Sequence, residues 1–151
     1  MDWPGDVLSI ILAVVFGAAI GLEREFSGKA AGLRTNVLIC LGAAVFTIIS
    51  REMAGETGSL TRIAAQIVTG VGFLGAGAII QDRGGVHGLT TAATIWLVAS
   101  IGMACGAGFY ALAAISTLIA MAVLLGFRHL ERALARYGGR HKPQGHPDEH
   151  D

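Results

Sequence analysis

The residues that could do chemistry crowd into one short segment, GLEREFSGKAAGLRTN at 21–36, which lies between two runs without any charge. Its charged members are Glu23, Arg24, Glu25, Lys29 and Arg34. They could form a solvated connector, or they could form a polar site. Near hydrocarbon an unpaired charge is costly, so opposite charges there should pair. We therefore expect an ion pair between Arg34 and either Glu23 or Glu25.

Other polar residues stand where neighbouring apolar runs begin or end, and the expected helix ends bring them to the same membrane depth as this segment. Thr35 or Asn36, and Thr90, could instead serve only to cap free backbone N–H groups at helix starts. On the opposite side Arg62 and Gln66 share one helical face, because they are four residues apart. We expect Gln66 to hydrogen-bond to a neighbouring helix. The predicted polar cluster consists of Glu23, Arg24, Glu25, Arg34, Thr35, Asn36, Asp82, Thr90 and Thr91.

Enzyme chemistry finds little support in the sequence, which has no nucleophile elbow, HExxH motif or P-loop. The isolated position of His87 favours a loop or capping role over catalysis. Cys40 and Cys105 lie in or beside apolar runs, so we expect them to be buried small hydrophobes. A GxGxxG pattern at 70–75 lies inside an apolar run, not between a strand and a helix. We expect no enzyme activity, no cofactor and no bound metal.

The composition is that of a membrane protein. The chain has 151 residues, of which 53% are apolar, 22 more are glycine and only 15% are charged, with a mean hydropathy of +0.61. A soluble protein typically carries about 25% charged residues. The net charge of zero gives no reason to expect a nucleic-acid partner. The start MDWPGDV has acids where a cleaved signal peptide has bases, so the first apolar run should be kept as a membrane helix.

Uncharged runs predict an all-α integral membrane protein, a bundle of about five transmembrane helices. A span needs about 20 residues, which three of the runs can supply singly, while the run at 88–127 is long enough for two. The second run could instead be a re-entrant segment. A β-barrel is disfavoured because the runs do not alternate. The expected spans are 6–22, 34–52, 62–81, 89–105 and 108–128.

The distribution of Lys and Arg predicts the orientation. The first loop, the third loop and the tail together hold nine basic residues, whereas the opposite side holds two. The positive-inside rule then places the N-terminus outside and the C-terminus in the cytoplasm. We expect residues 1–128 to form the transmembrane domain and residues 129–151 a basic, then disordered, tail. Within that tail, HLERALARYGGR can continue the last helix for a turn or two as a basic, amphipathic piece. Cys40 and Cys105 would lie at different depths, so we expect no disulfide.

Glycine is dense in the third expected span, at Gly70, Gly72, Gly75 and Gly77. In lipid, glycine allows helix backbones to approach closely. We therefore expect this helix to be central and packed on more than one neighbour, with a flexible wall beside a polar site as the sharper alternative. Its glycine faces would also permit a homo-oligomer, and we favour a dimer.

Five motifs, in order and together covering about residues 8–110, resemble the MgtC/SapB family of bacterial inner-membrane proteins. The resemblance implies a five-helix membrane domain with a cytoplasmic C-terminus. It also implies a role in growth at low magnesium and, in pathogens, in survival inside macrophages. Relatives are thought to act by regulation, restraining the F1Fo ATP synthase, and are not established Mg²⁺ transporters. The motifs are GLERE, GKAAGLRTN, LGAAVF, RIAAQIVTGVGFLGAGAII and VHGLTTAATIWLVASIG.

Two departures from the family pattern stand out. Some relatives have Asn at the position of Thr90, and many carry a folded cytoplasmic domain where about 23 residues remain here, so the chain resembles a short form. The resemblance favours a non-enzymatic regulatory membrane protein that contacts lipids, its own copies and other membrane proteins such as ATP synthase. The alternative is a small oligomeric ion or solute transporter or channel that uses the polar cluster. The family's polar elements fall on Glu23, Arg24, Arg34, Thr35, Asn36, Arg62, Gln66, Thr90 and Thr91.

Overall fold

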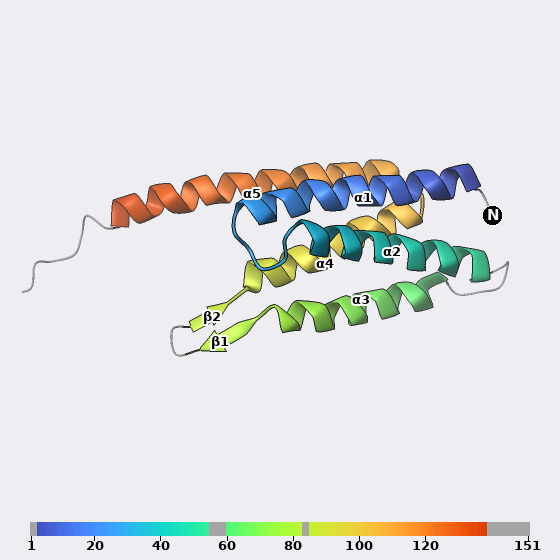
Figure 1. Ribbon diagram of the computed structural model, residues 1–151, viewed down its shortest axis with the longest axis horizontal. Coiled ribbons are helices and arrows are strands. Elements are labelled where there is room, and N and C mark those ends of the chain that lie inside the picture. The colour runs from blue at the N-terminus through green and yellow to red at the C-terminus, as the bar shows by residue number, and fades with distance from the viewer. Residues whose placement is uncertain (1–2, 55–59, 83–84, 139–151) are drawn as a thin grey trace, which may run out of the picture.

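Five helices lie side by side along one axis in the computed structural model, and a short β-hairpin extends from one end (Figure 1). The structure describes residues 3–54, 60–82 and 85–138, with side chains at 3–53, 64–82 and 85–126. We call the end with the hairpin the hairpin end and the opposite end, where the first helix begins, the N-terminal end. The elements are α1 (Trp3–Phe26), α2 (Leu33–Ala54), α3 (Leu60–Gly77), β1 (Ile80–Asp82), β2 (Gly85–His87), α4 (Leu89–Gly106) and α5 (Tyr110–Gly138).

The helices confirm the predicted all-α membrane bundle. Among the described residues, three segments are long and apolar enough to cross a membrane: Trp3–Phe26, Leu33–Met53 and Leu89–Gly106. Two shorter apolar stretches, Ala64–Gly77 and Tyr110–Gly126, run beside them. The protein is therefore a membrane protein. Its orientation, with the hairpin end in the cytoplasm, stays a prediction.

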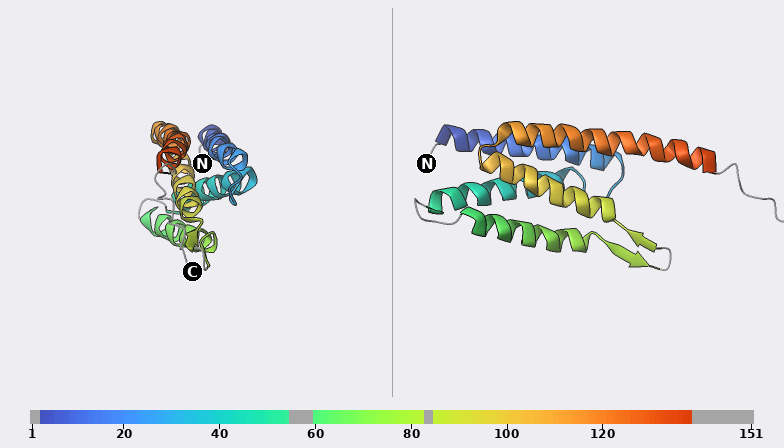
Figure 2. Two further views of the ribbon diagram at one scale, coloured as in Figure 1. Left: turned by 90° about the vertical axis from the view of Figure 1, so that its left-hand side faces the viewer. Right: turned by 180° about the vertical axis from the view of Figure 1, so that it is seen from behind.

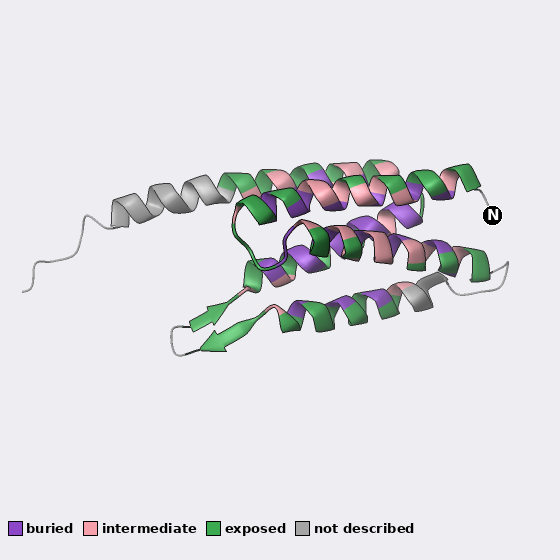
Figure 3. Cartoon of the chain, in the orientation of Figure 1, coloured by how far each residue is buried: buried purple, intermediate pink, exposed green. Residues whose placement is uncertain are grey.

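The central helix is α4, which packs against α1, α2, α3 and α5 (Figure 2). Its core residues Ile95, Val98 and Ile101 are at most 4% exposed, and buried positions recur along its length (Figure 3). A helix that is apolar on all sides is suited to such a place. The expectation that the third helix is central was wrong, because α3 lies at the edge of the bundle. It does pack on more than one neighbour, namely α2 and α4.

Two glycines of α1, in the sequence GAAIG at 17–21, bring α1 close to α2. A Cβ atom on Gly17 would lie 2.9 Å from Cβ of Cys40, and one on Gly21 would lie 2.8 Å from Cα of Leu33. Real Cβ atoms essentially never come this close. The four-residue spacing is that of the small-xxx-small pattern that lets membrane helices approach.

A second pair of glycines, in the sequence GMACG at 102–106, brings α4 close to another side of α2. A Cβ atom on Gly102 would collide with the carbonyl oxygen of Cys40, and one on Gly106 would lie 2.8 Å from Cβ of Thr47. Helix α2 is thus held between α1 and α4 by glycine contacts on both sides. Cys40 and Cys105 lie within this core as free, buried cysteines, as expected.

The glycines that we expected to pack have no such role within one copy. A Cβ atom on Gly70, Gly72 or Gly77 would meet nothing within 4 Å, and one on Gly75 would make only an ordinary contact with Ala92, at 3.6 Å. Close helix packing through glycine therefore does occur, as expected, but it involves glycines of α1 and α4 and not those of α3.

The third span ends earlier than expected, at Gly77 instead of residue 81. β1 pairs antiparallel with β2, so that Ile80 faces His87 and Asp82 faces Gly85. The chain returns at Gly88, whose φ of 87° is left-handed and whose Cβ, if present, would collide with the carbonyl oxygen of Ala78. Only glycine fits this crossing.

The fifth helix is longer than the expected span. It continues without a break to Gly138, through HLERALARYG, a segment rich in good helix formers. The predicted continuation of the last helix into the tail is therefore confirmed, through residues 129–138. The remainder of the tail, 139–151, lies outside the described residues.

The glycine contacts of α2 predict an asymmetric response to alanine. Gly102→Ala should lower the free energy of unfolding by about 1–3 kcal/mol, because the new methyl group meets backbone that cannot yield. Gly126→Ala is the matched control, since a Cβ there meets nothing within 4 Å, and it should be neutral or slightly stabilising. Unfolding in mixed detergent micelles, followed by circular dichroism, measures both. Equal effects of the two changes would contradict the packing described here.

Candidate functional site

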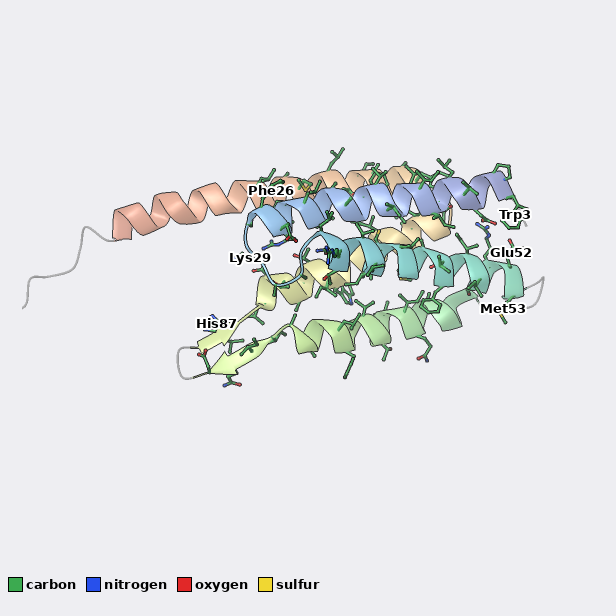
Figure 4. The ribbon with its side chains drawn as sticks, viewed as in Figure 1. Trp3, Phe26, Lys29, Glu52, Met53 and His87 are labelled. Atoms are coloured by element: carbon green, nitrogen blue, oxygen red, sulfur yellow. The ribbon has the colours of Figure 1, made fainter. Side chains whose placement is uncertain are left out.

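A polar cavity of about 810 Å³ opens at the hairpin end. It lies between the end of α1, the strand β2, the start of α4 and the middle of α5, where the side chains of Phe26, Lys29 and His87 are found (Figure 4). Four of the predicted cluster residues line it. The lining residues are Glu23, Arg24, Phe26, Ser27, Lys29, Val86, His87, Gly88, Leu89, Thr90, Thr91, Val123 and Leu124.

Glu23 and Arg24 are the buried charges of this cavity, with exposures of 7% and 4%. Nη1 of Arg24 lies 3.6 Å from Oε2 of Glu23, and the hydroxyl of Ser27 donates to Oε1 of Glu23 at 2.7 Å. Within the described residues, Oε2 of Glu23 and Nε of Arg24 have no hydrogen-bond partner. Charged side chains are almost never buried unless paired, and here the pairing leaves one charged atom of each residue without a hydrogen bond.

The start of α4 forms another wall of the cavity. Gly88 is the N-cap residue, and no side chain caps the helix; the amide of Ala92 donates to the carbonyl of Gly88. The N–H groups of the first turn have no partner within the helix, and they carry the positive end of its dipole. Thr90 therefore does not fill the capping role that was the alternative to a place in the polar cluster. Thr91, which is 5% exposed, also lines the cavity.

Glu25 has a separate role and does not enter the cavity. Its Oε2 accepts a hydrogen bond from the backbone N–H of Leu33 at 3.0 Å. A side chain of α1 thus provides the acceptor for a free backbone N–H group at the start of α2. A negative charge is favourable at a helix N-terminus. Since Glu23 and Glu25 are two residues apart, they project from nearly opposite sides of α1.

The expected ion pair of Arg34 with Glu23 or Glu25 is absent from the described residues. Both carboxylates have other partners, Ser27 with Arg24 for one and the start of α2 for the other. Arg34 and Thr35 are exposed on the first turn of α2 and do not line the cavity.

Asn36 is fully buried, but it does not cap a helix. Its amide nitrogen donates to the carbonyl oxygens of Ala31 and Gly32, at 2.7 and 2.8 Å. These bonds fasten the connection between α1 and α2 onto α2 itself. Asn36 therefore supports the segment that carries the cavity residues, without lining the cavity.

Asp82 lies on the hairpin and does not line the cavity, although its neighbour His87 does. Its Oδ1 lies 3.6 Å from Nε2 of His87, and both side chains are more than half exposed. Because α3 ends at Gly77, residue 82 does not stand at a helix end as the sequence suggested.

The outer-side polar pair is only half described. The side chain of Arg62 lies outside the described residues. Gln66 is exposed and lines an apolar groove of about 650 Å³ between α2 and α3. The hydrogen bond expected from Gln66 to a neighbouring helix is not found in the described part of the chain.

Sequence reasoning missed a second polar cluster, at the N-terminal end, where Trp3 and Glu52 also lie (Figure 4). Arg51 of α2 forms an ion pair with Asp6 of α1, which is 5% exposed, and donates to the carbonyl oxygen of Gly106 of α4 at 3.3 Å. In the sequence, Arg51 contributed only to the number of basic residues between the second and third expected spans. The span boundaries already placed Asp6 and Arg51 on one membrane side, which was the available signal.

Hydroxyl groups extend this cluster to the fifth helix. The hydroxyls of Ser9 and Tyr110 lie 3.0 Å apart, and each is within hydrogen-bond distance of the carbonyl oxygen of Gly5, at 3.0 and 3.1 Å. Together with Arg51, they link α1, α2, α4 and α5 at this end of the bundle.

Most of the chain is similar in sequence to known proteins. The family model described as the MgtC family matches residues 10–133. Protein MgtC of Brucella abortus is 48% identical over 122 residues, which cover 81% of this chain and 51% of that protein. The putative magnesium transporter YhiD of Escherichia coli K12 is 46% identical, covering 82% of this chain and 61% of that protein.

A cyanobacterial relative, protein SrpB of Synechococcus elongatus, is 39% identical, covering 87% of this chain and 79% of that protein. The chain spans about half the length of the MgtC proteins that it matches. No solved structure gives a significant match.

The N-terminal cluster predicts a measurable coupling between α1 and α2. Asp6→Asn should lower the free energy of unfolding by roughly 1–3 kcal/mol, because it removes the buried charge that pairs with Arg51 and leaves, among the described residues, only the more exposed Glu52, at 3.6 Å, as its acidic partner. Adding Arg51→Gln should cost less in the Asp6→Asn background than in the unchanged protein. A double-mutant cycle in detergent measures this, and strictly additive losses would mean that the two side chains do not interact.

Proposed function

We propose that this chain, which belongs to the MgtC family, is a non-enzymatic regulatory protein of the bacterial inner membrane that serves magnesium homeostasis and growth at low magnesium. The family match over residues 10–133 and the high identity to bacterial MgtC proteins support this assignment. One relative carries the name putative magnesium transporter, which supports the link to magnesium.

The packing of the middle of the bundle is the observation that carries the regulatory proposal. Between the two polar ends the interior is filled by apolar side chains, of which Ile20, Val98 and Ile101 are at most 1% exposed. The hydroxyls of Thr94 and Thr117 there donate to carbonyls of their own helices. A single copy that is closed in this way favours action through its surfaces over conduction through its interior.

The apolar groove between α2 and α3 supports a partner within the membrane. Its walls include Leu38 and Phe46, which are 66% and 58% exposed, and Gly70, which leaves the groove open beside α3. Membrane helices associate by close packing against such surfaces. We propose that a helix of another membrane protein, with the F1Fo ATP synthase as the first candidate, packs here.

Transport is the second candidate function. The buried Glu23 and Arg24 face a cavity that opens at one end of the bundle, as the binding site of a transporter would. Because the interior of one copy is filled, this function would require a path between copies.

The two functions differ in what reconstitution should reveal. In inverted membrane vesicles with equal amounts of ATP synthase, the protein should lower ATP-driven proton pumping, and Phe46→Ala should weaken this effect. Leu118→Ala, at a 70% exposed position of α5 away from the groove, is the matched control and should leave the inhibition of pumping unchanged.

Proteoliposomes that contain the protein alone should show no saturable Mg²⁺ uptake. Pumping that is unchanged at every expression level would exclude ATP synthase as the target, and saturable Mg²⁺ uptake abolished by Glu23→Gln would establish transport instead.

We also propose that the protein forms a homodimer through the outer face of α3. Small residues recur there at helical spacing, and all are exposed. A small-xxx-small face of this kind is the usual contact between membrane helices. The residues are Ala65, Thr69, Gly72 and Ala76.

The dimer proposal predicts that Gly72→Leu yields monomers in mild detergent, because the leucine side chain holds the two α3 helices apart. Ala122→Leu adds the same side chain at an exposed position of α5 and should leave the dimer intact. Light scattering of the detergent-solubilised protein measures the mass. Monomers in the unchanged protein, or dimers in Gly72→Leu, would contradict the proposal.

A further inference from the structure

We propose that the cavity at the hairpin end binds a phosphate group, and that the phosphate belongs to the headgroup of an anionic phospholipid. Two features carry this inference: the buried Arg24, whose Nε has no hydrogen-bond partner among the described residues, and the uncapped start of α4. Both line one cavity. The inference concerns what the cavity holds, so it does not depend on the regulatory function proposed above.

Arg24 supplies the first requirement, a buried donor without an acceptor. The residue is 4% exposed, and its Nε has no hydrogen-bond partner among the described residues. Its charged neighbour Glu23 lies at 3.6 Å, beyond the length of a hydrogen bond. A guanidinium group offers five donors in a planar fork that matches the oxygens of a phosphate.

The start of α4 supplies the second requirement, a set of free backbone donors. The helix is 18 residues long, and no side chain caps its first turn. Such an N-terminus favours an anion through its N–H groups and its dipole. The side chains of Thr90 and Thr91 add hydroxyl donors at the same place.

The charge of the cavity favours an anion over a cation. Arg24 and Lys29 outnumber Glu23, and Glu23 already accepts from Ser27 and faces Arg24. Within the described residues, no group of three His, Cys, Asp or Glu side chains could hold a metal ion. Glu23 therefore serves to orient the guanidinium of Arg24.

The rim of the cavity favours a lipid as the source of the phosphate. Phe26, Leu89 and Val123 line it and are 84%, 58% and 47% exposed. These residues lie at the ends or along the sides of helices that span the membrane, where acyl chains would meet them. Free phosphate shares the chemistry of the headgroup but gains nothing from this apolar rim.

The test is a ligand titration of the full chain, purified in a neutral detergent at fixed ionic strength. Thermal unfolding, followed by tryptophan fluorescence, reports binding because a ligand of the folded state raises the midpoint. The probes are dioleoylphosphatidylglycerol, inorganic phosphate and dioleoylphosphatidylcholine. We expect phosphatidylglycerol to bind at least about tenfold more tightly than phosphatidylcholine, since only it adds net negative charge.

Three variants locate the binding. Arg24→Gln should weaken phosphatidylglycerol binding by about tenfold or more, and Lys29→Gln by about threefold to fivefold. Arg34→Gln removes an exposed base from the same end of the bundle outside the cavity, so it should change nothing. Lys29 is exposed, so its variant decides the question if Arg24→Gln fails to fold.

Each outcome has one meaning. Phosphatidylglycerol binding that is sensitive to Arg24 and Lys29, without comparable binding of inorganic phosphate, supports the lipid. Inorganic phosphate that binds as tightly and with the same sensitivity keeps the phosphate site and overturns the lipid as its source. Equal binding of the two lipids without phosphate binding, or unchanged affinity in Lys29→Gln and Arg24→Gln, overturns the site. None of these measurements involves ATP synthase or growth, so failure here leaves the regulatory function untouched.

Discussion

The rest of the structure depends on the close approach of α2 to two helices at once. Lipid provides no hydrophobic force that drives helices together, so the contact between backbones must be tight enough to hold by itself. Gly17 and Gly21 of α1 provide this on one side, and Gly102 and Gly106 of α4 provide it on the other. Since α1 also contacts α4, the three helices pack on one another, and the two charged clusters lie at their opposite ends.

The two polar ends are built differently. At the N-terminal end, Arg51 pairs with Asp6 and donates to Gly106, and Tyr110 bonds to Ser9 and Gly5, so these side chains link neighbouring helices. Within the described residues, Oδ2 of Asp6 has no hydrogen-bond partner. At the hairpin end, the buried charges of Glu23 and Arg24 are only partly satisfied and border a cavity. Burial of ionised groups is costly in either case, but at the hairpin end both residues with unpartnered charged atoms line a cavity.

The sequence was sufficient for the class of fold and for part of the site. Uncharged runs revealed all five helices, since length and hydropathy act locally, and the segment 21–36 led to Glu23 and Arg24. It was not sufficient where the answer depended on neighbours. Gly70 and Gly72 looked like packing residues, but glycine density does not reveal which helix is central, although the GxxxG spacing at Gly17 and Gly102 was visible. Neither Arg34 nor Asp82 lines the cavity: Arg34 is exposed on the first turn of α2, and Asp82 lies on the hairpin because α3 ends at Gly77.

The length of α5 has a mechanical consequence. Its 29 residues make a rod of roughly 43 Å, longer than the hydrocarbon core of about 30 Å. The helix passes the cavity at Val123 and Leu124 and continues without interruption for about 20 Å to Gly138 (Figure 1). A stiff lever pivoting where it leaves the bundle turns a small tilt into a larger sweep at its tip. A tilt of α5 at the cavity wall would therefore move Gly138 over a larger distance than Val123 or Leu124.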